Sequence, residues 1–257
     1  MKKTILVFAC ASAALAHAKV AVPVLESFAQ GSRQVRVETY APEDAARHPA
    51  VILLHGADNF EPHADAYRGS AQALAENGYV TLLVHYFDAT ATRFADEASI
   101  TSNFLEWMET AAEAVSFAAN KSNVQPERIG LAGFSLGASL ALSLASQDSR
   151  IGAVAEFYGT LPDLAAAFLK RMPPVLILHG LNDRLVPSTE AYKLQKLLQA
   201  KGVPFEMKIY PGQGHGFTGE ATSDAEARTL AFFNRFLKGT RKSASTSASA
   251  GTSRSTF

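Results

Sequence analysis

Three residues in this chain have the types and the order of a nucleophile, an acid and a base. The first lies in Gly133-Phe134-Ser135-Leu136-Gly137, where a serine stands between glycines. The apolar run 128–132 before it indicates a buried strand, and the run 138–145 after it indicates a helix. A serine on such a sharp turn exposes its hydroxyl, and the glycines let strand and helix close around it. Because this pattern arises by chance in roughly one chain in ten of this length, its weight depends on residues downstream.

A serine hydroxyl is a weak nucleophile that needs a base, and the base needs an acid to orient it. Only His179 and His215 lie downstream of Ser135. His179 ends a strand pattern with no strand-end acid between it and Ser135, whereas His215 lies in the Gly-rich loop 211–217 after the last predicted strand. We therefore predict that His215 is the base, although a loop histidine without function is the alternative.

The acid is expected after a strand and before the histidine, because elbow hydrolases carry the order serine, acid, histidine. Asp183 meets this condition in the loop 179–187, and a simple turn aspartate is the alternative. The other acidic residues of this interval lie within or beside helices or within strands: Asp148, Glu156, Asp163, Glu190 and Glu206.

An ester carbonyl that is attacked by serine develops a negative charge, which two backbone N–H groups can stabilise. We expect one donor at Leu136, directly after the nucleophile. We expect the other at Ala57, in the loop His55-Gly56-Ala57 that follows an apolar strand pattern. A plain strand-ending turn is the alternative for that loop.

The elements that must position these residues alternate between strands and helices. Apolar or alternating runs predict strands at 33–40, 50–54, 79–87, 128–132, 151–158, 174–178 and 205–210. Helices are predicted from about 63 to 77, over a long segment with Phe104, Met108, Ala111, Val115 and Ala118 on one face, and at 138–145, 161–172 and 188–200. A last helix is expected to open with a capping box at Ser223 and Glu226 and to carry Ala227, Leu230, Phe233 and Leu237 on one face. This order predicts an α/β fold with a doubly wound, mostly parallel sheet and helices on both faces.

Length and charge limit the kinds of protein that the chain can be. Its 257 residues suffice for one α/β domain, which we place at 19–238. The 24 basic and 24 acidic residues give no net charge, which argues against a nucleic-acid or anionic-membrane surface. The Ser/Thr/Ala-rich segment 239–257 is expected to be a disordered tail.

The first 18 residues have the pattern of a signal peptide. Lys2-Lys3 precedes the apolar run 5–15, and Ala16-His17-Ala18 has the spacing of a cleavage site. We expect export to a bacterial periplasm or outside the cell, with no stable membrane insertion after cleavage. An uncleaved anchor or a lipoprotein signal at Cys10 is the alternative. Cys10 is the only cysteine, so cleavage would leave a chain without disulfides or thiol nucleophiles.

The chain resembles the α/β-hydrolases and, more narrowly, the dienelactone hydrolase family, over about residues 35–238. The stretches that carry the resemblance are Leu54-His55-Gly56-Ala57, Tyr86-Phe87-Asp88, Pro126 to Gly130 running into 133–137, Phe157-Tyr158-Gly159, the loop 179–187 and Tyr210 with Gly214-His215-Gly216-Phe217. The enzymes that name this family carry cysteine in the elbow, so Ser135 makes the chain more similar to its serine carboxylesterases. The resemblance implies that no metal or organic cofactor is needed.

The combined prediction is a serine hydrolase that acts on a small-molecule ester or lactone. The residues expected to line its substrate pocket, with ordinary core packing as the alternative, are Phe60, Tyr86, Phe87, Tyr158 and Leu161. His63 and Asp65 on one helix turn do not make a metal site. A serine peptidase, an acyltransferase and a non-catalytic binding module remain as alternatives, and the sequence does not predict an oligomeric state.

Overall fold

The computed structural model describes residues 18–58 and 60–239. The predictions of a signal peptide at 1–18 and of a tail at 239–257 therefore fall almost wholly outside the described residues. Both ends of the described chain meet at the C-terminus of one helix. Ala18 N–H donates to Glu76 O (2.7 Å), and Lys238 Nζ donates to Asn77 O (2.5 Å).

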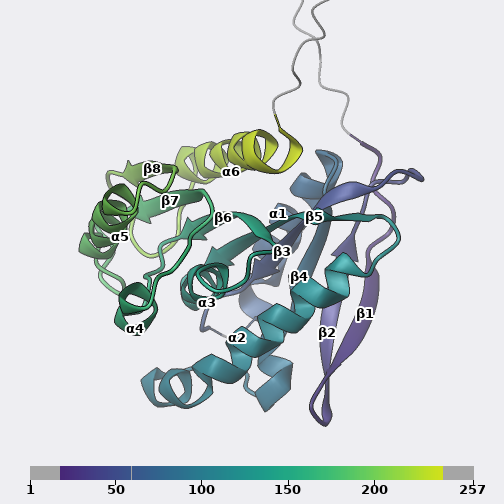
Figure 1. The fold of residues 1–257 in the computed structure, drawn as a ribbon, viewed down its shortest axis with the longest axis horizontal. Helices are drawn as coiled ribbons and strands as arrows, with labels where there is room; N and C mark the ends of the chain where they lie inside the picture. Colours follow the sequence, from purple (N-terminus) through teal and green to yellow (C-terminus); the bar gives the residue numbers. More distant parts are fainter. Residues whose placement is uncertain (1–17, 59, 240–257) are drawn as a thin grey trace, which may run out of the picture.

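The architecture is an eight-stranded sheet in the order β1-β2-β4-β3-β5-β6-β7-β8 (Figure 1). The strands are β1 Val24–Gln30, β2 Arg33–Tyr40, β3 His48–Leu54, β4 Val80–Val84, β5 Val124–Phe134, β6 Ile151–Phe157, β7 Val175–Gly180 and β8 Phe205–Tyr210. The pairs β1·β2 and β2·β4 are antiparallel, and all other pairs are parallel. The mostly parallel sheet predicted from the apolar runs is confirmed.

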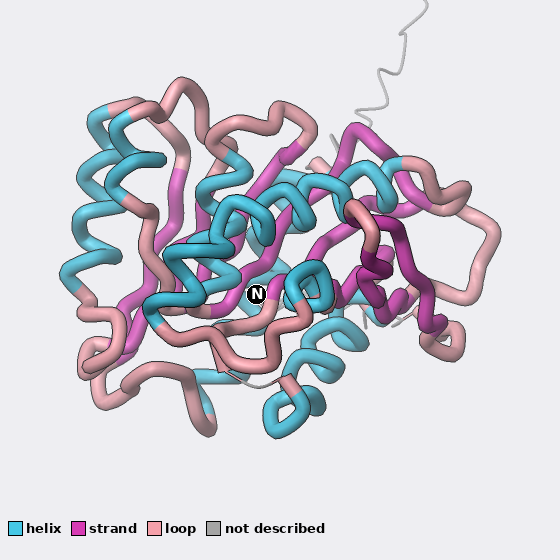
Figure 2. Tube along the Cα trace, turned by 90° about the horizontal axis from the view of Figure 1, so that it is seen from below, coloured by secondary structure: helices cyan, strands magenta, loops and turns pink. Residues whose placement is uncertain are grey.

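Helices cover both faces of this sheet (Figure 2). They are α1 Ala64–Glu76, α2 Glu97–Ala119, α3 Leu136–Ala145, α4 Asp163–Ala167, α5 Thr189–Ala200 and α6 Glu220–Phe233, with 3₁₀ helices at Glu61–His63 and Tyr86–Thr90 and a π-helical end at Asn234–Lys238. One core cluster contains Trp107 of α2, Leu140 of α3 and Leu194 of α5. The other contains Leu74 of α1 and Phe232 of α6. None of the described helices is both long and apolar enough to cross a membrane.

Several predicted boundaries were wrong, and one strand was not predicted. The strand expected at 79–87 ends at Val84, and the chain turns into a 3₁₀ helix where Asp88 accepts hydrogen bonds from Arg36. The last helix begins at Glu220, three residues before the expected capping box, because Gly219 at φ +60° ends the preceding loop. Ala227, which was expected on the apolar face, is exposed. Strand β1 was not predicted, and its outer residues are largely exposed at the sheet edge.

The parallel strands end together at one edge of the sheet. Leu54 of β3 pairs with Gly133 of β5, Phe134 with Phe157 of β6, and Gly180 of β7 with Tyr210 of β8. In open α/β sheets, ligands bind outside this carboxyl edge. The loops that leave this edge contain the residues expected to do chemistry.

Candidate active site

Ser135 lies on the sharp turn between β5 and α3. Its backbone has φ 54° and ψ −116°, a region that residues with side chains rarely adopt. Ser135 N–H donates to Phe157 O at 2.9 Å, which ties the turn to the neighbouring strand. Gly137 has to lack a side chain, because a Cβ there would collide with Leu54 O of β3. This close contact brings the turn against the loop that follows β3.

The structure brings Ser135, His215 and Asp183 into one hydrogen-bonded chain. His215 Nε2 lies 2.8 Å from Ser135 Oγ, and His215 Nδ1 lies 2.8 Å from Asp183 Oδ2. An ionised carboxylate only accepts hydrogen bonds, so the Nδ1 of His215 carries the proton. Its Nε2 lone pair then faces the serine hydroxyl, which is the arrangement needed to take the hydroxyl proton.

The side chain of Asp183 is completely buried and held by backbone donors. Its Oδ1 accepts hydrogen bonds from the N–H groups of Leu185 and Val186, both at 2.9 Å. His179 is also buried, and its Nε2–H donates to Val186 O at 2.8 Å. Burial lowers the pKa of His179, so its ring is neutral and fixes the loop rather than competing for the role of base.

The loops that carry Asp183 and His215 are joined through their backbones. Leu181 N–H donates to Tyr210 O at 3.0 Å, and Asn182 N–H donates to Gln213 O at 2.9 Å. A Cβ on Gly180 would collide with Gly214 O, so the two loops touch at that glycine. The separation of the acid from the base is therefore set by main-chain contacts.

The loop 55–57 lies directly against the serine turn. A Cβ on Gly56 would meet both the Tyr67 hydroxyl, at 3.4 Å, and Ser135 Cβ, at 3.6 Å. Within the described residues, no acceptor is found for the N–H of Ala57 or of Leu136. Both N–H groups are thus available to an oxygen bound beside Ser135.

Tyr67 of α1 supports the loop 55–57, and no sequence motif indicates this role. Its hydroxyl accepts a hydrogen bond from Gly56 N–H at 3.1 Å. His55 Nδ1–H donates to Gly56 O at 2.8 Å, so both polar groups of Gly56 are held in place. The only signal in the sequence was an aromatic residue one helical turn after the predicted start of α1.

Three of the five residues expected to line a pocket surround the His55 ring, and two of them, Phe60 and Phe87, also line a pocket beside it. The ring stacks on Tyr86 at 4.2 Å between centroids, and Phe87 and Phe60 approach it edge-on at 4.8 Å and 5.4 Å. The Tyr86 hydroxyl donates to His55 O at 2.9 Å. Burial lowers the pKa of His55 to about 4, so the ring is neutral. These aromatics support the loop 55–57, while Leu161 is buried in the core.

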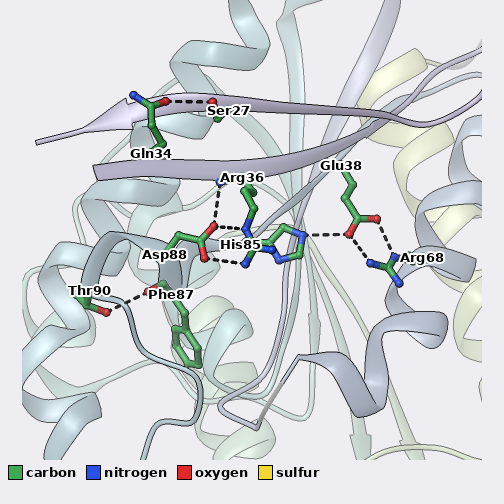
Figure 3. A network of polar contacts seen from close by, with 9 residues as sticks. All are labelled: Ser27, Gln34, Arg36, Glu38, Arg68, His85, Phe87, Asp88 and Thr90. Carbon is green, nitrogen blue, oxygen red and sulfur yellow. Dashed lines mark hydrogen bonds and ion pairs between the residues drawn. The ribbon is translucent and has the colours of Figure 1, made fainter. Parts of the chain in front are cut away.

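A polar network beside these aromatics fixes the start of the 3₁₀ helix (Figure 3). Asp88 accepts two hydrogen bonds from the Arg36 guanidinium, at 2.8 Å and 2.9 Å. Glu38 accepts two from Arg68, both at 2.8 Å, and lies 3.1 Å from Nε2 of the buried His85. Strand β2, helix α1 and the segment that carries Tyr86 and Phe87 are thereby joined.

Tyr158 is the one predicted pocket residue that contacts His215 in the described chain. The two rings lie 4.9 Å apart edge-on, and Tyr158 adopts φ 45°. The turn is held by Glu156, whose carboxyl accepts a hydrogen bond from Gly159 N–H at 2.9 Å. Glu156 is fully buried, and burial raises its pKa to about 8, so it is protonated at neutral pH. The strand pattern around Glu156 excludes it as the acid that orients the base and gives no sign of its role in this turn.

Metal ligands do not gather near this site. Across residues 18–58 and 60–239, no group of three or more His, Cys, Asp or Glu side chains is placed to hold a metal ion.

Comparisons with known proteins agree with this architecture. A family model described as the dienelactone hydrolase family matches residues 35–239. The human protein called carboxymethylenebutenolidase homolog is 28% identical over 207 residues, which are 75% of this chain and 81% of that protein.

Solved structures with the same fold include two kinds of hydrolase. A dienelactone hydrolase-like promiscuous phosphotriesterase from metagenomic libraries has a TM-score of 0.72 at 17% identity, over 84% of this chain and 98% of that one. The acylaminoacyl peptidase of Pyrococcus horikoshii has a TM-score of 0.69 at 16% identity, over 86% of this chain but 42% of that one. At these identities, the structural likeness concerns the fold alone.

Proposed function

Because the chain belongs to the dienelactone hydrolase family and is a hydrolase, we propose that it cleaves carboxylic esters or lactones with Ser135 as nucleophile. The observation that carries this proposal is the pair of 2.8 Å contacts that joins Ser135 Oγ, the His215 ring and Asp183. Such a chain activates a hydroxyl for attack on an acyl carbon.

In the proposed reaction, Ser135 Oγ attacks the carbonyl carbon while His215 Nε2 takes the hydroxyl proton. The oxyanion accepts hydrogen bonds from the N–H groups of Ala57 and Leu136. Protonated His215 then gives its proton to the leaving alcohol oxygen, and an acyl-enzyme remains. Water attacks the acyl-enzyme with His215 as base again, and Ser135 regains its proton as the carboxylic acid leaves. Asp183 keeps the imidazole in the required tautomer throughout. No step needs a cofactor.

Covalent labelling of the purified protein with a fluorophosphonate tests the nucleophile. We expect one adduct, on Ser135, and its loss in His215→Ala, because an unactivated serine reacts slowly. Ser135→Ala should lower kcat for p-nitrophenyl acetate by on the order of a million-fold. An adduct on another residue, or near-normal turnover by Ser135→Ala, would contradict the proposal.

Product analysis separates the ester hydrolase from its alternatives. A serine peptidase would release amine from small peptide substrates, and an acyltransferase would pass the acyl group to an added alcohol or thiol. A folded protein without any labelling would support a binding module. Ester or lactone hydrolysis is preferred because the family model that matches residues 35–239 is that of the dienelactone hydrolases.

We further propose that the protein acts after export from a bacterial cell. The support is the basic pair Lys2-Lys3, the apolar run 5–15 and the Ala16-His17-Ala18 spacing. Mass measurement of the protein from its natural host should find a chain that begins at Lys19, and a retained Met1 would contradict cleavage.

A further inference from the structure

A groove separates α1 from α6 on the face of the sheet that these two helices cover. Its first part has a volume of ≈ 400 Å³ and lies over Phe134 and Phe157, where β5 and β6 end. A second part of ≈ 220 Å³ continues it, and both parts are lined by Ser70, Phe134, Phe157 and Glu226. The first volume lies within the range of small-molecule sites.

Residues that line the groove adjoin three parts of the candidate active site: the serine turn, the histidine loop and the loop 55–57. Phe134, which precedes Ser135, forms its floor, and Gly216, which follows His215, lines its wall. Tyr67 lines it as well, and its hydroxyl accepts the hydrogen bond from Gly56 N–H in the loop 55–57. Ser135 and His215 line neither part, but Tyr158 lines the first part and its ring contacts the His215 ring, so the groove lies next to the catalytic pair.

The lining chemistry favours an uncharged, apolar occupant. Beyond Phe134 and Phe157, the floor of the second part is formed by Leu53, Leu74 and Ala132. No Lys or Arg lines either part, and the charged Glu226 is exposed at the rim. A carboxylate-bearing substrate would find no Lys or Arg here, and His63 is the one basic residue of the lining, whereas a hydrocarbon chain would exchange water for aromatic and aliphatic contacts.

We propose that this groove binds the acyl chain of the substrate, so that the enzyme prefers esters of medium-chain, uncharged carboxylic acids. The proposal rests on the proposed ester hydrolysis at Ser135 and names its substrate class. Each methylene group that enters the groove should raise kcat/KM by about two- to fourfold, as expected for burial of a CH₂ group.

The test compares kcat/KM for p-nitrophenyl acetate, butanoate, hexanoate and octanoate. Gly69 of α1 provides the key variant, because it lines the groove and a Cβ there would meet nothing within 4 Å. Gly69→Leu should fill the groove without a collision, and leucine favours a helix more than glycine does. We expect the octanoate-to-acetate ratio of kcat/KM to fall at least tenfold in this variant.

A second variant and a control separate filling of the groove from a general effect of adding leucine to α1. Ala66→Leu, also in the lining, should lower the same ratio. Gln72→Leu adds the same apolar side chain to α1 at a residue that lines neither part, so the ratio should stay within twofold of the unaltered protein. A second series with a constant acetyl group and lengthening alcohols should show a much weaker length dependence.

The outcomes distinguish this inference from the proposed function. If Ser135-dependent acetate hydrolysis is present but kcat/KM does not rise with acyl length, or if Gly69→Leu and Ala66→Leu leave the ratio unchanged, the groove proposal is wrong. A preference for long alcohols that these two variants abolish would overturn it as well. If activity does not depend on Ser135, the proposed function itself fails.

Discussion

At the residue scale, the two oxygens of Asp183 have different partners. Oδ1 is held by two backbone N–H groups of its own loop, and Oδ2 is left for the His215 ring. The backbone bonds orient the carboxylate without help from any mobile side chain. The tautomer of His215 therefore depends on a group that the main chain fixes.

Replacing this carboxylate by an amide tests that dependence. In Asp183→Asn, an amide N–H turned toward His215 would make Nδ1 an acceptor and place the ring proton on Nε2, which then cannot take a proton from Ser135. We expect kcat to fall by roughly 10⁴-fold with an unchanged melting temperature. Steady-state kinetics and fluorophosphonate labelling rates measure this, and a loss smaller than tenfold would argue against the tautomer role.

The limits of sequence reasoning differ from residue to residue. Ser135, Asp183 and His215 could be placed at one edge because each follows a strand pattern and parallel strands end together. The support of the loop 55–57 by Tyr67 and Tyr86 could not be predicted, because it depends on how α1 and the 3₁₀ helix pack. For that reason the contacts of Tyr86, Phe60 and Phe87 with the His55 ring could not be predicted.

At the scale of elements, the ends of β7 and β8 act as one unit. The loops after them share two backbone hydrogen bonds and touch at Gly180 and Gly214. Neither loop can shift without moving the other, so the distance between Asp183 and His215 depends on the register of this strand pair.

A methyl group at Gly180 should disturb that unit. In Gly180→Ala, the new Cβ collides with Gly214 O and displaces the loop that carries His215. Because a misplacement of about 1 Å can cost a hundredfold in rate, we expect kcat to fall by about that factor. Gly212→Ala is the matched control, since a Cβ there meets nothing within 4 Å although its φ of +77° adds strain. Similar kcat values for the two variants would contradict the collision argument.

Elements with continuous apolar runs could be predicted, and elements at the periphery could not. Buried strands such as β3 and β7 contain short, continuous apolar runs, and these runs predict strands. Strand β1 carries exposed Val24 and Leu25, and its existence depends on pairing with β2 rather than on burial. The start of α6 was misplaced because a Gly219 conformation, not a side-chain cap, begins that helix.

At the scale of the whole molecule, buried titratable groups make stability depend on pH. Burial raises the pKa of Glu156 to about 8 in the folded protein, whereas the unfolded chain releases this proton near pH 4.5, the ordinary pKa of glutamate. The unfolded state therefore binds fewer protons in this window, and the contribution of Glu156 to the free energy of unfolding falls as pH rises from 4.5 to 8. Burial lowers the pKa of His55 to about 4, and this group destabilises the fold as pH falls below about 6.5.

Glu156→Gln isolates the contribution of Glu156 to the pH dependence of the unfolding free energy. The amide keeps an oxygen for Gly159 N–H but carries no charge at any pH. We expect the variant to exceed the unaltered protein in unfolding free energy, by a margin that grows by on the order of 3 kcal/mol between pH 5 and pH 9. Urea denaturation at pH 5, 7 and 9 measures the margin. Parallel stability curves for the two proteins would show that Glu156 does not titrate in this window.

The meeting of both described chain ends at the C-terminus of α1 has a consequence for attachment. Helix α1 begins at Ala64, after the 3₁₀ helix that follows the loop 55–57, and its 13 residues span about 20 Å, so Glu76 lies at the end of the helix far from that loop. A tether joined at either end therefore leaves the molecule on the side away from Ser135. A protein immobilised on a surface, or fused to a carrier, at either end of its described chain would present its substrate entrance outward to the solvent.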